Sequence, residues 1–295
     1  MRDSLSSMPA RPTGRPCCAW VATAVALAAC ATPAPDTAVA SLTDAERAFA
    51  AMAAEQGVRA SFLANFADDG VAFEPEPVRL REAWSARPAP ADPKALRLQW
   101  APAAAAVAAS GDLGFTTGPF TLSLASGARP PSHGIFTSVW RRDAAGTWKV
   151  VLDAGVGTPA EIAAAELAPA PGLPTRAQSA ATAPATIERG TAMASAAGLA
   201  RQVAADGRWY REGESPVIGA AKIESLLAGA PSRLAFVPAA EVIARTRDLA
   251  YTYGHLAVTA GDGTIMRRGY VHLWKCDDAG EWKIAVAIWL TPGKD

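Results

Sequence analysis

The sequence predicts an α+β protein made of two tandem copies of one domain, each with helices followed by a mainly antiparallel sheet. Two observations predict this class. The stretch WRRDAAGTWKV at 140–150 returns as WKCDDAGEWKI at 274–284. Within a copy, the apolar pattern changes from a helical period to a period of two, and segregated helices and strands are typical of α+β domains.

The repeat extends beyond these two stretches. They share six of eleven positions, and upstream DLGFTTG at 112–118 matches DLAYTYG at 248–254. Further upstream, DGVAF at 69–73 matches DGRWY at 206–210. Three matches in the same order at similar spacing indicate a duplicated domain.

Helices open the first copy. Thr43 and Glu46 form the pattern of a capping box, which predicts a helix start. Gly70, in DDG at 68–70, is expected to end the helical part with a positive φ. Apolar residues recur between these points at the spacing of two helical segments: Phe49, Met52, Val58, Phe62, Leu63 and Phe66.

Strands close each copy. In the second, 249–260 and 269–276 alternate between faces and are rich in Tyr, Val, Thr and Trp, which favour strands. DDAG at 277–280 predicts a turn, so the segment 281–290 pairs back as a hairpin. The first copy repeats this hairpin across DAAG at 143–146.

The order of elements, the unit of roughly 110 residues and the pattern W-x-x-D-x-x-G-x-W-K-[VI] resemble the nuclear transport factor 2-like superfamily. The likeness is to its SnoaL-like and ketosteroid-isomerase-like branch, over about 41–157 and 186–293. It implies cone-shaped domains, with a curved sheet wrapping the helices around a pocket. Members commonly dimerise through sheet faces, so an intramolecular pseudo-dimer, or a homo-oligomer, is expected.

The N-terminal 30 residues predict an export signal. Arg11 and Arg15 precede a short apolar run, 19–30, whose last residues Leu27–Cys30 resemble a bacterial lipobox. That resemblance implies lipidation of Cys30 and, because Ala31 follows it, the periplasmic side of the outer membrane. An ordinary signal peptide or a cytosolic tail are the alternatives.

Composition defines the remaining segments and excludes some partners. Residues 31–40 are predicted to be a tether and 158–185 a linker, which leaves domains at 41–157 and 186–295. TPAEIAAAEL within the linker suggests a short helix capped by Thr158. The 28 basic and 28 acidic residues balance, which argues against nucleic-acid binding. Once the signal is removed and Cys30 carries lipid, Cys276 is the one thiol left, so no internal disulfide is expected.

Aromatic and histidine side chains mark the second copy as the richer candidate pocket. Tyr253 and His255 share one strand face and Tyr270 and His272 another, and a concave face of this kind suits a small apolar or aromatic ligand. The alternative is that they are ordinary strand residues and satisfied core histidines. The full set of pocket candidates here is Trp209, Tyr210, Tyr253, His255, Tyr270, His272 and Trp289.

The first copy offers Asp153, which becomes a general base if burial raises its pKa, or faces water at a strand end. Ala287 stands at the matching position, which suggests that no site is shared between copies. Asp112 and Asp248 match between copies and are interpreted as structural. No spacing for a metal site and no motif for a cofactor is present.

These features leave three hypotheses. The leading one is an exported, lipid-anchored protein that binds a small molecule or stabilises a partner without catalysis. The second is a SnoaL-like isomerase, cyclase or hydrolase that uses acid–base chemistry in the second pocket, with His255 or an acid as base and Tyr253 as donor. The third is a structural envelope lipoprotein with filled domains.

Overall fold

A computed structural model describes residues 35–74, 76–168, 172–173, 182–228 and 232–290, all within one compact unit, Thr32–Asp295. The predicted signal, Cys30 included, lies outside the described residues. Two mixed sheets, each preceded by helices, confirm the α+β class. The first sheet and its helices are called domain 1 below, and the second sheet and its helices domain 2.

Domain 1 has a seven-stranded sheet in the order β2-β1-β7-β6-β5-β3, with β4 paired to β5 beside β3. The β1–β7 pairing is parallel and the others are antiparallel. Its elements are α1 (Pro35–Gln56), α2 (Val58–Asn65), β1 (Phe66–Phe73), β2 (Pro77–Arg79), α3 (Leu80–Ser85), β3 (Leu96–Trp100), β4 (Ala104–Val107), β5 (Leu113–Leu124), β6 (Ser132–Arg142) and β7 (Trp148–Thr158).

Domain 2 repeats this topology with six strands in the order β10-β11-β12-β13-β8-β9, and β13–β8 is again parallel. A single bulged strand, β10, stands where domain 1 has β3 and β4. After the short α4 (Ala164–Leu167), its elements are α5 (Pro184–Arg189), a 3₁₀ turn (Thr191–Met193), α6 (Ala196–Gln202), β8 (Val203–Arg211), β9 (Val217–Ile218), α7 (Ala220–Ala228), β10 (Ser232–Ile243), β11 (Leu249–Ala260), β12 (Ile265–Cys276) and β13 (Trp282–Trp289).

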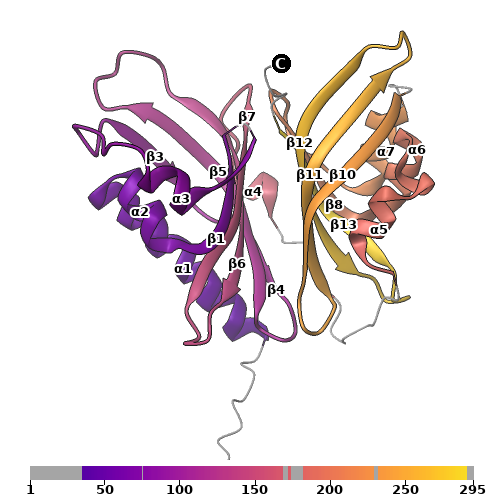
Figure 1. Cartoon of the computed structure of the whole chain (residues 1–295), viewed down its shortest axis with the longest axis horizontal. Coiled ribbons are helices and arrows are strands. Elements are labelled where there is room, and N and C mark those ends of the chain that lie inside the picture. The colour runs from indigo at the N-terminus through magenta and orange to yellow at the C-terminus, as the bar shows by residue number, and fades with distance from the viewer. Residues whose placement is uncertain (1–34, 75, 169–171, 174–181, 229–231, 291–295) are drawn as a thin grey trace, which may run out of the picture. The chain divides into compact units, whose positions relative to one another are not determined.

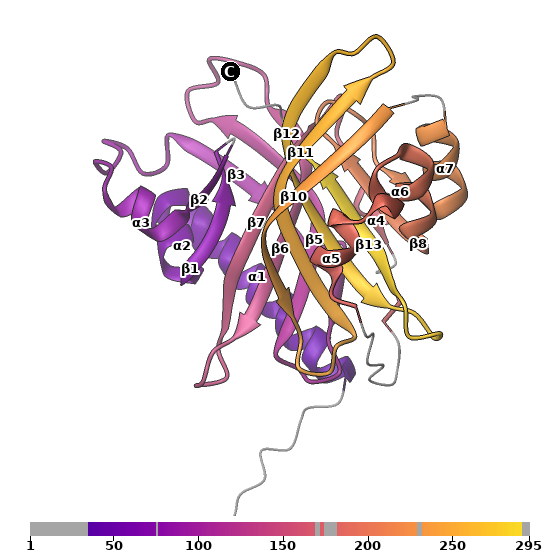
Figure 2. The same cartoon turned by 45° about the vertical axis from the view of Figure 1, so that its right-hand side comes forward.

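Each sheet is covered on both faces. Figure 1 shows α1–α3 on the outer face of the first sheet and α5–α7 on the outer face of the second, and Figure 2 shows the same layers from another side. Each helix-facing side has its own buried cluster, whereas a third cluster joins residues of both sheets, among them Phe115, Val156, Tyr251 and Val286. The sheets therefore pack face to face, which is the contact on which the pseudo-dimer hypothesis depends.

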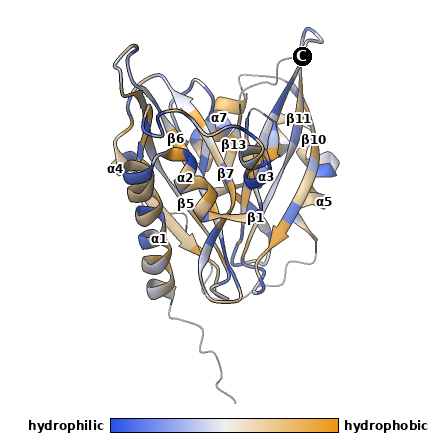
Figure 3. Ribbon diagram, turned by 60° about the vertical axis from the view of Figure 1, so that its left-hand side comes forward, coloured by the Kyte–Doolittle hydropathy of each residue, from blue (hydrophilic) through white to orange (hydrophobic). Residues whose placement is uncertain are grey.

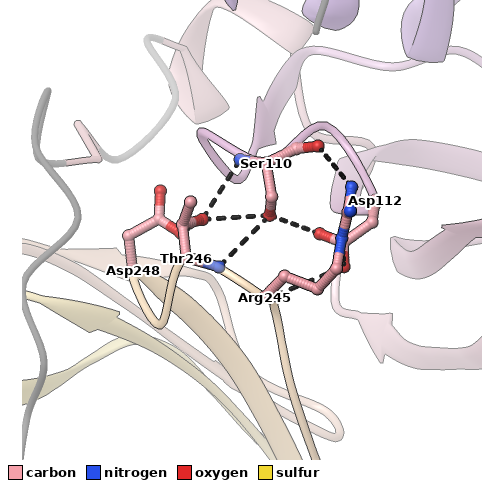
Figure 4. Close-up of polar contacts among 5 residues, drawn as sticks. All are labelled: Ser110, Asp112, Arg245, Thr246 and Asp248. Carbon is pink, nitrogen blue, oxygen red and sulfur yellow. Dashed lines mark hydrogen bonds and ion pairs between the residues drawn. The ribbon is translucent and has the colours of Figure 1, made fainter. Parts of the chain in front are cut away.

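Two matching loops, 108–112 and 244–248, meet at one end of this contact (Figure 4). The hydroxyl oxygens of Ser110 and Thr246 lie 3.0 Å apart, and each accepts the backbone N–H of the other residue, at 3.1 and 3.4 Å. This exchange relates the two loops by an approximate two-fold axis.

The carboxylates of Asp112 and Asp248 extend the same symmetry. Asp248 is fully buried and accepts the backbone N–H of Ala109 at 2.7 Å. Asp112 accepts the backbone N–H of Arg245 at 3.3 Å and its Nε at 3.1 Å. The two matched aspartates thus bind the opposite domain, in line with their interpretation as structural.

The predicted strands agree with the structure more closely than the predicted helix ends. The helix expected to begin at Thr43 begins at Pro35, inside the expected tether, and Thr43 Oγ1 donates to Val39 O one turn earlier. Gly70 ends no helix, since α2 stops at Asn65 and Gly70 lies within β1 without a positive φ. Thr158 ends β7 instead of capping a helix, because α4 starts only at Ala164.

Helix α1 is amphipathic, and hydrophilic patches interrupt its hydrophobic colour in Figure 3. The residues of α1 that are buried against the sheet recur every one or two helical turns: Ala38, Leu42, Phe49 and Ala53. Glu46 falls on the same buried stripe, which places a carboxyl group in an apolar interior. None of the described helices is both long and apolar enough to span a membrane.

Candidate functional site

A buried glutamate occupies the helix-facing side of each sheet. Glu46 of α1 has no exposed surface, and Glu188 of α5 is 2% exposed. Each accepts a hydrogen bond at 2.5 Å from a buried threonine, Thr116 on β5 or Thr252 on β11. These threonines are identical members of the repeat, so the two copies share a buried glutamate–threonine arrangement, although the Asp153 position itself is not shared because domain 2 has Ala287 there.

A repeated tryptophan completes the shared arrangement. Trp140 Nε1 donates to Glu46 Oε2 at 2.9 Å and lies 3.2 Å from Thr116 Oγ1. Trp274 Nε1 donates to Thr252 Oγ1 at 2.9 Å. In both domains, the first Trp of the repeated hairpin therefore supports the buried carboxyl group directly or through the threonine.

The buried Glu46 carboxyl group of domain 1 has a raised pKa. Burial disfavours the charged form of Glu46 and is the dominant cause, whereas hydrogen bonds from Thr116, Trp100 and Trp140 act in the opposite direction. The Trp100 Nε1–Glu46 Oε1 distance is 2.6 Å.

A second acid lies beside it. Asp153 on β7 accepts a hydrogen bond from Ser138 Oγ at 2.7 Å, and Ser138 also lies close enough to Glu46 to lower the pKa of that carboxyl group slightly. Desolvation raises the pKa of Asp153 to about 7, with a further contribution from the charge of Glu46, while the Ser138 bond lowers it. The side chain is partly accessible although protein atoms crowd its carboxyl group. A carboxyl group that titrates near neutral pH on a partly accessible residue can exchange a proton with a bound molecule.

Small residues and aromatic rings surround this acid. Ala72 pairs with Asp153 across β1 and β7, and Gly155, the next residue on the same face, is exposed. Phe136 pairs with Gly155, and the ring of Phe120 lies over it, 3.4 Å from where a Cβ atom would stand. The helix-facing side of domain 1 therefore presents an acid next to apolar ring surfaces.

Domain 2 places bulky side chains at the matching positions. Trp209 corresponds to Ala72 and Trp289 to Gly155, and their rings are 4.5 Å apart and nearly fully buried. Ala287 corresponds to Asp153, so Trp209 pairs with an alanine here. The interior that is lined by small residues in domain 1 is filled by two indoles in domain 2.

His272 replaces Ser138 and bonds to the buried glutamate. Its Nδ1 lies 2.7 Å from Glu188 Oε1, and the Tyr270 hydroxyl donates to Glu188 Oε2 at 2.7 Å. Burial, followed by the charge of Glu188 and the hydrogen bond to it, raises the pKa of Tyr270, which stays protonated. His272 and Tyr270 have no exposed surface, so this cluster is part of the packed core.

The structure divides the predicted residues between two faces. Trp209, Tyr270 and Trp289 lie in the helix-side core of domain 2, and His272 packs against Tyr270. Tyr210 and Tyr253 lie on the opposite face, in or against the cluster between the sheets. The face that carries Tyr253 and His255 is therefore not the one that encloses the helices, because the other domain covers it.

His255 lies at the edge of this interface. It is half-exposed, with Nδ1 3.4 Å from Glu76 Oε2 of domain 1. His255 and His272 point to opposite faces and do not meet. Among the described residues, no group of three or more His, Cys, Asp or Glu side chains is placed to hold a metal ion.

The two glutamates were missed by reasoning from the sequence. The signal was present, because each is followed by arginine: Glu46-Arg47 and Glu188-Arg189. The distance to the next repeat differs, however, since Asp69 is 23 residues after Glu46 and Asp206 is 18 after Glu188. Because the helices of domain 2 are shorter, Glu46 and Glu188 do not stand at the same distance from the repeated segments.

No protein-family model matches the sequence, and no curated protein is significantly similar to it. Several solved structures are similar to part of it. A protein of unknown function with a cystatin-like fold from Nostoc punctiforme is 15% identical, covering 41% of this chain and 91% of its own, with a TM-score of 0.32. A nuclear transport factor 2-like protein of unknown function from Pseudomonas putida is 16% identical over 41% and 86%, with a TM-score of 0.33.

A ketosteroid isomerase-like protein from Erwinia carotovora atroseptica is 15% identical over 40% of this chain and 95% of its own, with a TM-score of 0.32. Similarity at this level assigns the chain to no family.

Proposed function

We propose that this protein is exported and lipid-anchored, and that domain 1 binds a small, mainly apolar molecule at Asp153. The observation that carries the proposal is Asp153, a partly accessible residue on the helix-facing side of the sheet whose desolvated carboxyl group has a pKa of about 7. Domain 2 has alanine at this position and a filled interior. The two domains then have separate roles, with domain 1 as the binding domain.

The chemistry around Asp153 defines the ligand. Below a pH of about 7 the carboxyl group is protonated and donates a hydrogen bond, which suits a carbonyl or ether oxygen. Phe120 and Phe136 provide apolar ring surface next to it, and no described lysine or arginine is bonded to Asp153. A neutral molecule with one oxygen acceptor and an apolar or aromatic body fits this combination.

Domain 2 has a supporting role in this proposal. Its sheet covers the face of domain 1 that points away from the helices, where Phe115 and Val156 are buried in one cluster with Tyr251 of domain 2. A curved sheet with one bare apolar face is an aggregation hazard in a separate domain. The second copy removes that hazard without contributing side chains to the site at Asp153.

Export and anchoring rest on the apolar run that ends at Cys30. The test is the intact mass of the full chain and of Cys30→Ala, together with their distribution between membrane and soluble fractions. A mass that indicates cleavage before Cys30 plus acyl chains, absent in Cys30→Ala, supports the anchor. An unprocessed chain, or one cleaved elsewhere without acyl chains, overturns it.

Native mass spectrometry tests ligand binding, with the protein as cells process it, extracted in mild detergent and never refolded. The wild-type chain is expected to retain an adduct that is lost on denaturation. Gly155→Trp, which places the Trp289 side chain of domain 2 in domain 1, is expected to abolish the adduct, and Asp153→Asn to reduce it. Glu224→Ala, an exposed change on α7, is the matched control.

An adduct that survives Gly155→Trp lies elsewhere and overturns the site. No adduct in any variant, with no binding in a screen of neutral aromatic ketones and ethers, supports the structural hypothesis instead.

Acid–base catalysis is the second candidate function. Its proposed site is now in domain 1, whereas the sequence predicted it in domain 2. The observation that favours it is the neutral-range pKa of Asp153, since a base near the working pH abstracts and returns a proton most effectively. Once a ligand is known, its conversion by wild-type protein should follow an apparent pKa near 7 and be lost in Asp153→Asn. A ligand recovered unchanged after prolonged incubation would leave binding as the function.

A further inference from the structure

Three polar residues form a row across the sheet of domain 1. Thr116 of β5 pairs with Ser138 of β6, and Ser138 pairs with Asp153 of β7. Paired residues on neighbouring strands point to the same face, so these side chains lie next to one another on the helix-facing side. One end of the row bonds to α1, since the Thr116 hydroxyl donates to Glu46 Oε2 at 2.5 Å.

Ser138 lies between two carboxyl groups. Its hydroxyl donates to Asp153 Oδ2 at 2.7 Å and is close enough to Glu46 to lower the pKa of that group. The strand register explains this proximity. Thr116, opposite Ser138, bonds to Glu46, and Trp140, two residues further along β6, donates to Glu46 Oε2 at 2.9 Å. One hydroxyl is therefore within reach of both acids.

Domain 2 has a matching row with a different end. Thr252 pairs with His272, and His272 pairs with Ala287. His272 Nδ1 lies 2.7 Å from Glu188 Oε1, which shows that a side chain at the position of Ser138 reaches the buried glutamate. The row ends at an alanine, so domain 2 has one acid where domain 1 has two.

Glu46 depends on this row for contact with the outside of the domain. It has no exposed surface, and neither has Thr116. The two indole N–H groups that donate to Glu46 can give a hydrogen bond but cannot accept a proton. Ser138, in contrast, leads to Asp153, which is a partly accessible residue.

The two acids are the titratable groups that act on each other here. Among the described residues, Glu46 is the one whose charge contributes to the raised pKa of Asp153. Arg142, further along β6, donates to Ser41 of α1 instead. The residues that contact the two acids from β1, β3, β5 and β6 are uncharged: Ala72, Trp100, Thr116, Ser138 and Trp140. A charge on one acid thus makes the other hold its proton more tightly.

We propose that Ser138 relays a proton between Glu46 and Asp153, which makes Glu46 a proton reservoir for the ligand site. The inference rests on the proposed function, because Asp153 is the group that meets the ligand. Glu46 and Ser138 act through Asp153 and are positioning residues. An Asp153 that has given its proton to a bound molecule regains one from Glu46, without water entering the site.

The transfer is balanced at every atom. At the start, the O–H of protonated Glu46 donates to Ser138 Oγ, and the Ser138 O–H donates to ionised Asp153. Both O–H bonds break, while one new O–H bond forms on Ser138 and another on Asp153. The negative charge moves from Asp153 to Glu46, where two indole N–H groups and the Thr116 hydroxyl stabilise it.

Carboxyl ¹³C NMR of the full chain, labelled in Asp and Glu and free of ligand, tests the relay. The variants Asp153→Asn and Glu46→Gln assign the two signals. In the wild type, both signals are expected to move over the same pH range around 7, each as a single sharp line. They move together because the pair shares its remaining proton, and they stay sharp because Ser138 passes that proton rapidly.

Ser138→Ala removes the relay and keeps both acids. The midpoint of Asp153 should rise by about 1 pH unit, because its carboxylate loses a hydrogen bond. The Glu46 line should broaden or split in two, since its proton then waits for a transient opening of the core. Ser138→Thr keeps the hydroxyl and should restore the sharp line. Ser225→Ala, a change of an exposed serine on α7, is the matched control and should leave both signals unchanged.

Two results overturn the relay. One is a Glu46 line that stays in place while Asp153 titrates. The other is a Glu46 line that is as sharp in Ser138→Ala as in the wild type, because the proton then reaches Glu46 by another route. Neither result depends on a ligand. Joint titration without an adduct in native mass spectrometry would support the relay and overturn the ligand site, whereas an adduct with a stationary Glu46 line would do the reverse.

Discussion

The two domains hold a glutamate in the same way and surround it differently. Thr116 and Thr252 each donate to the buried glutamate of their domain. In domain 1 a second acid, Asp153, lies next to this group, whereas in domain 2 the same region has alanine and a histidine. The difference shows that the buried carboxyl group belongs to the architecture and that its neighbours determine what a domain can do.

Side-chain volume follows the same division. Ala72 and Gly155 leave the acid of domain 1 partly accessible, whereas Trp209 and Trp289 fill the equivalent positions in domain 2. A packed interior stabilises but excludes ligands, and an interior lined by small residues does the reverse. On the proposed function, domain 2 stabilises the pair of domains and domain 1 keeps the acid beside small residues.

The largest expected effect comes from removing the glutamate of the packed domain. Glu188→Ala leaves the Tyr270 and Thr252 hydroxyls and His272 without their acceptor in a fully buried cluster. We expect the free energy of unfolding to fall by about 3–5 kcal/mol. Urea denaturation followed by tryptophan fluorescence measures it, with Glu224→Ala, an exposed change, expected within about 0.5 kcal/mol of wild type.

If the free energy of unfolding falls by less than about 1 kcal/mol in Glu188→Ala, the hydrogen-bonded groups around Glu188 can rearrange freely. The buried glutamate would then not be a requirement of the architecture in domain 2.

The acid of domain 1 should make stability depend on pH. Its pKa of about 7 in the folded protein lies above that of an unfolded aspartate, so protonation of Asp153 favours the folded state. This contribution to the free energy of unfolding is full below about pH 4 and is lost as the pH rises through 7. Asp153→Asn removes this contribution. We expect the variant to be about 2 kcal/mol more stable than wild type at pH 8, a value halved because the residue is partly accessible to water.

At pH 5 the difference between variant and wild type should fall to below about 1 kcal/mol, because most of the loss of stability takes place between pH 5 and pH 7. Urea denaturation at pH 5 and pH 8 measures both values. Parallel pH profiles for the two proteins would mean that Asp153 titrates in its usual acidic range and would remove the main support for a site in domain 1. Glu46 also has a raised pKa, so a residual slope in the variant is expected.

The strands and the duplication could be predicted from the sequence because they depend on local signals. The predicted strand 249–260 is β11 to the residue, and the hairpin 269–290 differs mainly at its ends. Alternation along a strand groups residues by face but does not say which face meets the helices. Here both faces are covered, so Tyr253 and Tyr270 were equally plausible as pocket residues.

The buried acids were harder to predict because a glutamate in a helix is normally exposed. Glu46 also fits a capping box with Thr43, a local interpretation that competes with burial and proved wrong. The informative pattern was tertiary: an identical Thr and an identical Trp, both buried with polar atoms, require an acceptor nearby. Asp153 was found from the sequence because it stands on the final strand, although its position near Glu46 was not.

Effects smaller than that of Glu188→Ala are expected at the two matched aspartates between the domains. Asp248 is fully buried and accepts the Ala109 N–H and, at 2.5 Å, the Thr246 hydroxyl, so Asp248→Ala should cost about 2–3 kcal/mol. Asp112 is partly exposed and pairs with Arg245, whose side chain water can also solvate, so Asp112→Ala should cost about 1 kcal/mol. Thermal denaturation of both variants measures the difference, and equal losses would mean that burial does not distinguish the two halves of this symmetric contact.

The smallest effect tests how much room exists beside Asp153. A Cβ atom at Gly155 would meet the Phe120 ring at 3.4 Å, ordinary contact, so Gly155→Ala should change stability by no more than about 0.5 kcal/mol. The matched variant is Gly134→Ala on the neighbouring strand, whose Cβ would lie 2.3 Å from both Phe120 Cζ and the backbone oxygen of Val156. The ring can move but the backbone cannot, so a loss of about 1–3 kcal/mol is expected. Thermal denaturation compares the two, and a Gly155→Ala loss as large as that of Gly134→Ala would mean that domain 1 is as tightly packed here as domain 2, leaving Asp153 without space for a ligand.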